Sequence, residues 1–342
     1  MAGYKISVIK GDGIGPEIVD ATLKVLEKLQ DKLGLKFNFI FAEAGDECFK
    51  KTGCALPKET IDIVKNSDAC LKGPVGETAM DTIVVLRQMF DLYVNLRPVK
   101  CYSPMDCIKR DIDFVIVREN TEDLYKGFEF QLNDIAIALR VITKRASQRI
   151  AEQAFKLAEL RNRKRSVVCV HKANVMRKTC GLFVEACREV ALKYKNIKFS
   201  EMYVDAAAMN IIRKPEDFDV ILTMNMFGDI LSDEAAQLIG GLGMAPSANI
   251  GDNLAIFEPV HGSAPDIAGK GIANPISMIL SAKMMLEWLA NTRNDPLCNK
   301  GAILIENAVR KTLEKGIKTI DLGGSSKTRD FTFALINELT NA

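Results

Sequence analysis

The sequence of 342 residues contains only two histidines and almost no net charge, and each shortage excludes a class of protein. Because 46 lysines and arginines face 44 acidic residues, a globally basic nucleic-acid-binding protein is excluded. His171 and His261 alone cannot form a histidine-rich metal site. No apolar run approaches the roughly 18 residues that span a bilayer, and residues 1–10 carry no cleavable leader. We expect a soluble, cytoplasmic protein that binds neither nucleic acid nor a membrane.

Cysteine is present, but not in the patterns that bind zinc or exchange disulfides. The nine cysteines are scattered and include no Cys-x-x-Cys pair, which a zinc ribbon or a redox motif requires. We expect most of them to be reduced, buried and structural. With 48% hydrophobic residues, the chain is long enough to form two compact lobes with buried cores.

Strand-like and helix-like segments alternate along the chain, without an internal repeat or a long polar linker. The expected strands cover 4–9, 36–42, 69–72, 114–117, 166–170 and 218–223. The expected helices cover 16–29, 60–65, 80–87, 146–161, 182–194, 277–289 and 303–315, with one more from 229 onward. This alternation predicts an α/β architecture in which helices shield the strands on both faces.

The glycine turn after the first strand, GDGIG at 11–15, invites comparison with the dinucleotide-binding fingerprint. That fingerprint needs a third glycine, where this chain has Pro16, and an acidic residue about 20 positions further on. The second expected strand runs up to Glu43, well beyond that spacing. We therefore expect a tight turn near an active site rather than a Rossmann pyrophosphate site.

Two aspartates, Asp229 and Asp233, stand at i and i+4 just after the expected strand 218–223. A helix would place both carboxylates on one face, at the end of a strand where α/β proteins bind ligands. Together with Asp205 they would offer oxygen ligands that suit Mg²⁺ or Mn²⁺. A solvated helix face is the alternative, and these residues alone leave both open.

Three arginines, Arg87, Arg97 and Arg118, stand near the ends of apolar segments. Guanidinium groups in such positions could hold the two carboxylates of a di-acid by paired hydrogen bonds. Each arginine on its own could equally be a surface charge, so the residues alone leave this open as well.

Long motifs occur in order along the chain: GDGIGPE at 11–17, LRQ at 86–88, DLYVNLRP at 91–98, VRENTEDLY at 117–125, HKANV at 171–175, YVDA at 203–206, GDILSD at 228–233 and EPVHGSAPDIAG at 258–269. Through them the chain closely resembles the β-decarboxylating dehydrogenase family, whose members include isocitrate, homoisocitrate, tartrate and 3-isopropylmalate dehydrogenases. Within the family it is most similar to the archaeal 3-isopropylmalate branch. The resemblance runs essentially from end to end.

The resemblance implies a fold of two α/β domains with a central cleft that is not a Rossmann fold. By similarity, residues 1–95 plus 240–342 form a large cofactor-binding domain, and residues 96–239 form a small domain with dimerisation elements. It further implies a homodimer, or a dimer of dimers, whose active sites are shared between subunits.

The resemblance also assigns roles to the residues singled out above. It gives the divalent cation to Asp229, Asp233 and Asp205 of the partner subunit, and the substrate carboxylates to Arg87, Arg97 and Arg118. Lys172, donated across the dimer, would take the hydroxyl proton, and Tyr125 would protonate the enolate carbon. Asn174 would contact substrate or nicotinamide, while Glu17 is interpreted as structural.

The implied cofactor is NAD. The resemblance places it on a loop and its surroundings: Glu258, His261, Gly262, Ser263, Ala264, Asp266, Ile267 and Asn274. The Asp266 carboxylate can accept hydrogen bonds from the adenosine ribose and would repel a 2′-phosphate, which predicts NAD over NADP. NADP-dependent family members typically carry Lys-Tyr at the positions of Asp266 and Ile267.

The helix that ends in Arg87 predicts the substrate. Met80, Ile83 and Val84 form an apolar face that could bury an isopropyl group, whereas the carboxylate of Asp81 would repel the third carboxylate of isocitrate. We therefore expect oxidative decarboxylation of 3-isopropylmalate to 2-oxoisocaproate, in leucine biosynthesis. Isocitrate, homoisocitrate or a broad range of 3-substituted malates remain as alternatives.

A second functional class is a non-catalytic subunit on the same scaffold, as occurs in some oligomeric isocitrate dehydrogenases. Such a subunit should lack some of the tyrosine, the lysine and the metal aspartates. All of these residues are present here: Tyr125, Lys172, Asp205, Asp229 and Asp233. The sequence therefore favours an enzyme.

Overall fold

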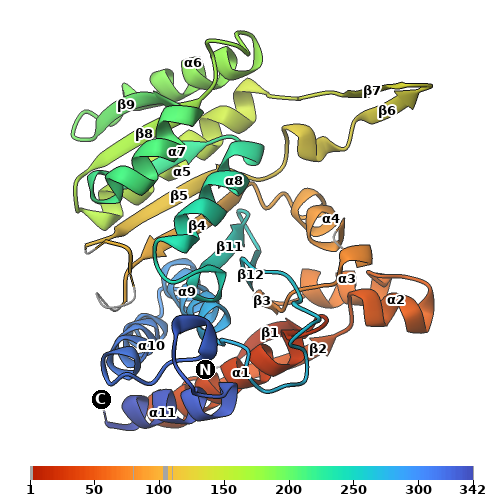
Figure 1. Cartoon of the computed structure of the whole chain (residues 1–342), viewed down its shortest axis with the longest axis vertical. Coiled ribbons are helices and arrows are strands. Elements are labelled where there is room, and N and C mark those ends of the chain that lie inside the picture. The colour runs from red at the N-terminus through yellow and green to blue at the C-terminus, as the bar shows by residue number, and fades with distance from the viewer. Residues whose placement is uncertain (1–2, 80, 103–106, 110, 342) are drawn as a thin grey trace.

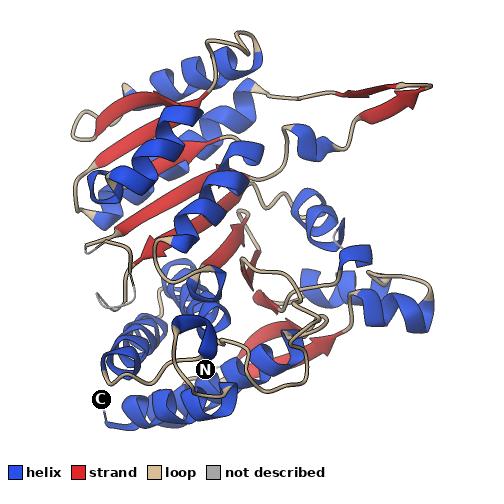
Figure 2. Ribbon diagram, in the orientation of Figure 1, coloured by secondary structure: helices blue, strands red, loops and turns tan. Residues whose placement is uncertain are grey.

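The computed structural model describes residues 3–79, 81–102, 107–109 and 111–341, and within them the chain forms one long sheet covered by helices (Figure 1, Figure 2). The ten strands of this sheet pair in the order β2-β1-β3-β12-β11-β4-β5-β10-β8-β9. Their bounds are β1 (Tyr4–Ile9), β2 (Phe37–Ala42), β3 (Ala69–Lys72), β4 (Val94–Lys100), β5 (Asp113–Glu119), β8 (Ser166–His171), β9 (Lys198–Tyr203), β10 (Val220–Thr223), β11 (Pro246–Ile250) and β12 (Ala255–Pro259). The expected α/β fold is confirmed.

Helices cover the sheet on both faces, with α5 and α9 on one side of its centre and α8 on the other. The helices are α1 (Gly15–Leu33), α2 (Asp46–Thr52), α3 (Lys58–Lys65), α4 (Asp81–Met89), α5 (Lys144–Arg161), α6 (Thr179–Ala191), α7 (Val204–Arg213), α8 (Asn225–Gln237), α9 (Ile276–Arg293), α10 (Pro296–Glu314) and α11 (Thr328–Asn341). Side chains on both faces of the central strands are therefore shielded from solvent, at least in part, by these helices.

The sheet is parallel towards its two ends and antiparallel at its centre, where β12, β11, β4 and β5 pair in succession. Because a Rossmann sheet is essentially parallel, this order agrees with the non-Rossmann fold that we expected. Strands of 1–95 and 240–342 meet those of 96–239 where β11 pairs with β4. The division into two domains stays a prediction, because the sheet and one hydrophobic cluster continue across this seam.

Helix α1 shows how local sequence produces an element. Pro16 occupies its first turn, where the missing N–H costs nothing, and Ile18, Val25 and Leu29 bury one face. The helix ends at Gly34, whose φ of 71° provides the left-handed cap. It therefore continues four residues beyond the expected end at 29 because no breaker precedes that glycine.

Several expected bounds shift in the structure. Helix α8 begins at Asn225 rather than 229, and α6 covers Thr179–Ala191 rather than 182–194. Neither helix has a side chain that caps its N-terminus, so the sequence carries no start signal for it. Helix α10 begins at Pro296, well before 303, with the Asp295 side chain as its cap.

A two-stranded ribbon, β6 (Glu129–Leu132) and β7 (Ile135–Ala138), stands out from the rest of the fold (Figure 1). Its large apolar side chains are exposed to solvent: Phe128, Phe130, Leu132, Ile135, Ile137 and Leu139. Apolar side chains that gather in this way on a surface mark an interaction site.

The cysteines largely match the expectation, with one correction. Six carry free, buried thiols, namely Cys48, Cys70, Cys169, Cys180, Cys187 and Cys298, and Cys54 is free and exposed. Cys101, directly after β4, and Cys107 instead form a disulfide, with Cα atoms 6.0 Å apart. Among the described helices, none combines the length and the apolar character that crossing a membrane requires.

Candidate active site

The three predicted arginines converge on one face at the centre of the sheet. Arg97 lies in β4 and Arg118 in the neighbouring β5, and both are almost completely buried. Helix α8 passes directly over Arg118, since a Cβ atom on Gly228 would lie 2.6 Å from its Cγ. Only a glycine permits this close approach, and it brings the acidic face of α8 onto the arginines.

Asp229 receives most of these contacts. The Arg118 Nη1 group donates to it, and Arg97 Nη2 lies 3.6 Å from the same carboxylate. The remaining nitrogens of Arg118 donate to Asn225 Oδ1 at 2.7 and 3.0 Å. Asp233, one turn later on α8, lies 3.6 Å from Arg97 Nη1. The predicted i, i+4 pair is thus on one face and directed at the arginines.

Burial and neighbouring charges set the ionisation of this cluster. Burial alone would raise the pKa of Asp229, but Arg118 and Arg97 outweigh it and hold that pKa below its usual value. For Asp233 burial prevails and its pKa is raised. Burial, together with the nearby charge of Arg118, lowers the pKa of Arg97 to about 10. The cluster therefore holds an ionised Asp229 between two buried guanidinium groups.

Tyr125 lies within this cluster, on the short 3₁₀ helix η2 (Leu124–Lys126). Its hydroxyl donates to Asp229 Oδ2 at 2.5 Å, and the Arg118 guanidinium lies 5.1 Å from its ring centroid. Burial raises the pKa of Tyr125, so the phenol keeps its proton at neutral pH. Gln88 on α4 donates to the Tyr125 carbonyl at 2.8 Å, which ties the predicted substrate helix to the tyrosine.

A buried polar network fixes the position of the Arg87 guanidinium group. Its Nε donates to Asn249 Oδ1 at 2.8 Å, and its Nη2 lies 3.3 Å from Glu258. Lys72, which is 2% exposed, donates to the other oxygen of Glu258 at 2.9 Å. Although burial opposes ionisation, Lys72 and Arg87 lower the pKa of Glu258 to about 2. Glu258, assigned to the cofactor by resemblance, here fixes the position of Arg87.

Sequence reasoning missed Lys72 and Asn249 as parts of this network. Both stand in buried, mainly apolar strands, and a charged or amide side chain in a buried strand requires buried partners. Asn249 accepts from Asn95 and from Asn120 at 3.0 Å each, in addition to Arg87. The polar residue in an apolar strand was the signal that could have identified them.

Lys172 and Asp205 pair with each other, apart from the arginine cluster. Lys172 Nζ donates to Asp205 Oδ1 at 2.6 Å, and this hydrogen bond lowers the pKa of Asp205. Asn174 is exposed. In the described part of the chain, no group of three His, Cys, Asp or Glu side chains could hold a metal ion. The predicted three-aspartate site is not assembled within one subunit, and its completion by a partner subunit stays a prediction.

The structure describes two of the three residues of the predicted apolar face of α4. Met80 lies outside the described residues. Ile83 is half-buried against the cluster that contains Leu86, and Val84 is half-buried one residue further along. Asp81 is exposed at the start of the helix. Ile83 and Val84 precede Arg87 by four and three residues, so the three side chains share one side of the helix.

The predicted cofactor loop packs against the glycine turn at 11–15. Ile14 N–H donates to the Ser263 carbonyl at 2.8 Å, and a Cβ on Gly13 would lie 2.0 Å from that oxygen. In the loop, His261 Nδ1 lies 2.9 Å from the Gly262 carbonyl, and burial lowers the pKa of this imidazole. His261 Nε2 is buried and has no hydrogen-bond partner among the described residues.

The other residues assigned to the cofactor surround this loop. Gly262 and Asp266 are exposed, Ala264 and Ile267 are half-buried, and Asn274 is buried. Asn274 Nδ2 donates to Asp321 at 2.9 Å. Glu17 accepts from the backbone N–H groups of Gly271 and Ala273 at 3.2 and 3.0 Å, so the structure places it as a brace beneath this segment.

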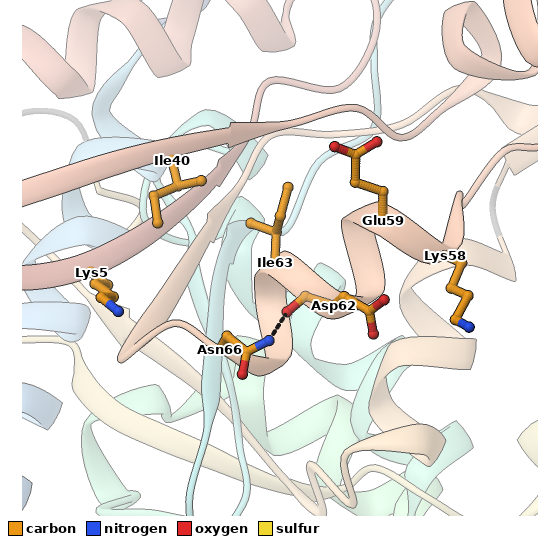
Figure 3. Close-up of a pocket in the computed structure, with 7 residues that line it drawn as sticks. All are labelled: Lys5, Ile40, Lys58, Glu59, Asp62, Ile63 and Asn66. Atoms are coloured by element: carbon orange, nitrogen blue, oxygen red, sulfur yellow. Dashed lines mark hydrogen bonds between the residues drawn. The ribbon is translucent and has the colours of Figure 1, made fainter.

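A separate hollow of about 560 Å³ lies between β2 and α3 (Figure 3). It is lined by Lys5, Ile40, Lys58, Glu59, Asp62, Ile63 and Asn66. The hydrogen bond drawn there, from Asn66 Nδ2 to the Asp62 carbonyl at 2.8 Å, joins two residues of one helical turn. None of the predicted site residues lines it, and we assign it no role.

Comparison with known proteins identifies the family. The family model described as isocitrate/isopropylmalate dehydrogenase matches residues 5–335. The chain is 53% identical to a 3-isopropylmalate dehydrogenase of Archaeoglobus fulgidus, over 96% of this chain and 97% of the relative. It is 48% identical to a homoisocitrate dehydrogenase of Methanocaldococcus jannaschii, over 97% of each chain. The crystal structure of isocitrate dehydrogenase from Methylococcus capsulatus matches with a TM-score of 0.91 and 42% identity, over 98% of this chain and 99% of that one. The chain therefore belongs to the isocitrate/isopropylmalate dehydrogenase family.

Proposed function

We propose that the protein oxidatively decarboxylates 3-isopropylmalate to 2-oxoisocaproate, a step of leucine biosynthesis, with NAD and Mg²⁺ or Mn²⁺. The observation that carries the proposal is the buried cluster in which Arg97 and Arg118 surround Asp229 and the hydroxyl of Tyr125. Buried guanidinium groups this close together suit a dicarboxylate, and a protonated phenol suits the final protonation step. The name and the 53% identity of the archaeal relative support the same reaction.

The donor set fits a hard divalent cation. Asp229 and Asp233 would provide carboxylate oxygens from one helix face, and Asp205 of the partner subunit would complete the set. When bound, the cation would act as a Lewis acid for negative charge on the substrate oxygens. The buried and unpartnered Nε2 of His261 fits a cofactor on the loop that follows β12. When bound, NAD would accept the hydride from C2.

The side chains of the cluster would then divide the work. Arg87, Arg97 and Arg118 hold the two carboxylates of the malate moiety and orient C2 and C3. The partner subunit's Lys172 removes the proton of the C2 hydroxyl. After the C3 carboxylate has left as CO₂, Tyr125 donates its proton to C3, with Asp229 and Gln88 holding the phenol in position.

The exposed ribbon β6–β7 supports the proposed dimer. A shared site needs Lys172 and Asp205 from one subunit beside Tyr125 and Asp229 from the other, and among the described residues of one subunit no three acidic groups come together to hold a metal ion. The ribbon presents six apolar side chains that are at least a third exposed, and a second copy of the chain would cover them.

A substrate panel tests the proposal directly. Initial rates of NADH formation should give the highest kcat/KM with 3-isopropylmalate, with isocitrate and homoisocitrate lower by about tenfold or more, because the half-buried Ile83 and Val84 bury apolar groups. Val84→Ser should lower kcat/KM for 3-isopropylmalate by about tenfold. Val85→Ser, at an exposed position of the same helix, is the matched control and should leave it unchanged. Equal or better turnover of isocitrate or homoisocitrate would overturn the substrate assignment.

A further inference from the structure

A groove of about 530 Å³ runs along the face of the central sheet opposite to the arginine cluster. Strand geometry places it there, because successive side chains of a strand point to opposite faces. In β4, Asn95 and Arg97 contact the active-site cluster, whereas Leu96 and Pro98 line the groove. In β11, Asn249 binds Arg87, whereas its neighbour Ala248 lines the groove.

The groove has an apolar floor and apolar walls. Leu96, Pro98 and Ile250 form part of the floor and remain only half-buried, although they belong to the central strands of the sheet. Leu157 on α5 lines one wall, and Trp288 on α9 lines the other. Such central positions are normally covered by packed helices, so a partly open, apolar groove here has room for a small molecule.

The charged residues around the groove limit what it can bind. Three of its four cations are already neutralised: Lys100 by Glu306 and Asp113, Lys283 by Glu287 and Glu306, and Arg161 by Asp113 and Asp219. Lys156, exposed on α5, forms no salt bridge with any residue that the structure describes; its charge helps to lower the pKa of Glu152 one turn earlier, but that carboxylate is paired with Lys193. One available cation beside an apolar floor complements one negative charge on an apolar body, and not a polyanion such as a nucleotide.

We propose that this groove binds an aliphatic monocarboxylate, with its chain on Leu96 and Trp288 and its carboxylate at Lys156. The site is separate from the dehydrogenase site, because the sheet lies between them. It does not depend on which 3-substituted malate the enzyme oxidises.

The protein carries its own probe for this site. Trp288 is the only tryptophan of the sequence, and it lines the groove. Titration of the full-length protein with octanoate should give a saturable change in tryptophan fluorescence. The same change should persist in the presence of saturating 3-isopropylmalate without NAD, where no turnover occurs, whereas octanoate bound to the active-site arginines would be displaced by this dicarboxylate. Absence of a saturable change, or displacement by the substrates, would overturn the proposal.

Variants at the groove test the charge requirement. Lys156→Gln should weaken octanoate binding about two- to fivefold, as expected for an ion pair at a solvent-exposed position. Binding of 1-octanol, which lacks the carboxylate, should not respond to this substitution. Lys195→Gln, at an exposed lysine outside the groove, is the control and should leave octanoate binding unchanged. Equal weakening of octanol and octanoate by Lys156→Gln would contradict the assignment of the carboxylate to Lys156.

A second pair of variants does not depend on Lys156. Leu160, which is 79% exposed at the edge of the groove, tolerates a polar side chain without a core defect. Leu160→Glu should weaken octanoate binding more than Leu160→Gln, because only the glutamate repels the ligand. Equal affinities of the two variants would show that no carboxylate binds beside α5.

Discussion

Two groups of predicted catalytic residues differ sharply in how the chain holds them. Arg118 is 1% exposed and forms bonds to Asn225 and Asp229 that fix its direction, whereas the Asp205 side chain is 67% exposed and has Lys172 as its ion-pair partner. Burial in a hydrogen-bonded cluster preorganises the first group within one subunit. The Lys172–Asp205 pair lies apart from that cluster and Asp205 is largely exposed, so the proposed donation to a second subunit would not have to break buried contacts of Asp205.

The largest effect should come from the centre of the buried cluster. Asp229→Asn keeps the size of the side chain but removes the charge that pairs with Arg118 and Arg97 and that accepts the Tyr125 hydroxyl. We expect kcat to fall by about 10²–10³ or more, since charge stabilisation in a preorganised site is lost. Wild-type activity should also vanish with a chelator and return with Mg²⁺ or Mn²⁺. Full activity in a chelator would exclude the metal-assisted mechanism.

Mixing two inactive mutants tests whether the buried cluster and the Lys172–Asp205 pair meet across subunits. Tyr125→Phe alters the buried cluster and Lys172→Met alters the exposed pair, and each homodimer should lose most of its activity. If the sites are shared, a heterodimer contains one intact site, and random exchange should restore about a quarter of wild-type activity. Verified heterodimers without activity would show that the two groups do not meet across subunits.

The buried network behind Arg87 predicts a large effect on stability. Glu258→Gln would leave Lys72 and Arg87 without their buried carboxylate, which should cost about 3–5 kcal/mol of unfolding free energy. Glu43→Gln is the control, because its ion pair with Lys51 is exposed and should contribute less than about 1 kcal/mol. Denaturant titrations measure both. A Glu258→Gln protein as stable as the control would mean that the network is not held by this charge.

The same carboxylate predicts a pH dependence with a defined sign. The folded-state pKa of Glu258 is about 2, below its ordinary value of 4.5, so its ionisation stabilises the fold at neutral pH. That contribution should be lost as pH falls from about 4.5 towards 2. The difference in stability between wild type and Glu258→Gln should therefore shrink over this range. A constant difference would contradict the lowered pKa.

The smallest effect should come from the exposed part of the cofactor loop. Asp266 is exposed and Ile267 half-buried, so their exchange for Lys and Tyr should leave stability nearly unchanged. The exchange should erode or reverse a preference for NAD over NADP, because a carboxylate that repels the 2′-phosphate is replaced by a cation. The ratio of kcat/KM for the two cofactors measures it. A wild-type enzyme that prefers NADP would refute the assignment.

Much of the fold could be predicted because its signals are local. The strand Tyr4–Ile9 and the start of α1 at the glycine turn match their expected places, since apolar periodicity and a proline in the first helical turn depend on neighbouring residues alone. The start of α8 could not be located, because Met224 offers no capping side chain. The ribbon β6–β7 was missed as well, since its apolar side chains have no core to face within one subunit.

The candidate site also contains residues that the sequence could identify and residues that only the structure identifies. Arg97, Arg118, Tyr125 and Asp229 could be named as candidates from the sequence because they stand in motifs that resemble those of the family. Only the tertiary structure decided that Glu258 joins Lys72 to Arg87, since the partners are 186 and 171 residues away along the chain. A sequence pattern carries information about residues that are close along the chain. The ion-pair partners of a buried charge are instead the residues that the order of the strands brings next to it.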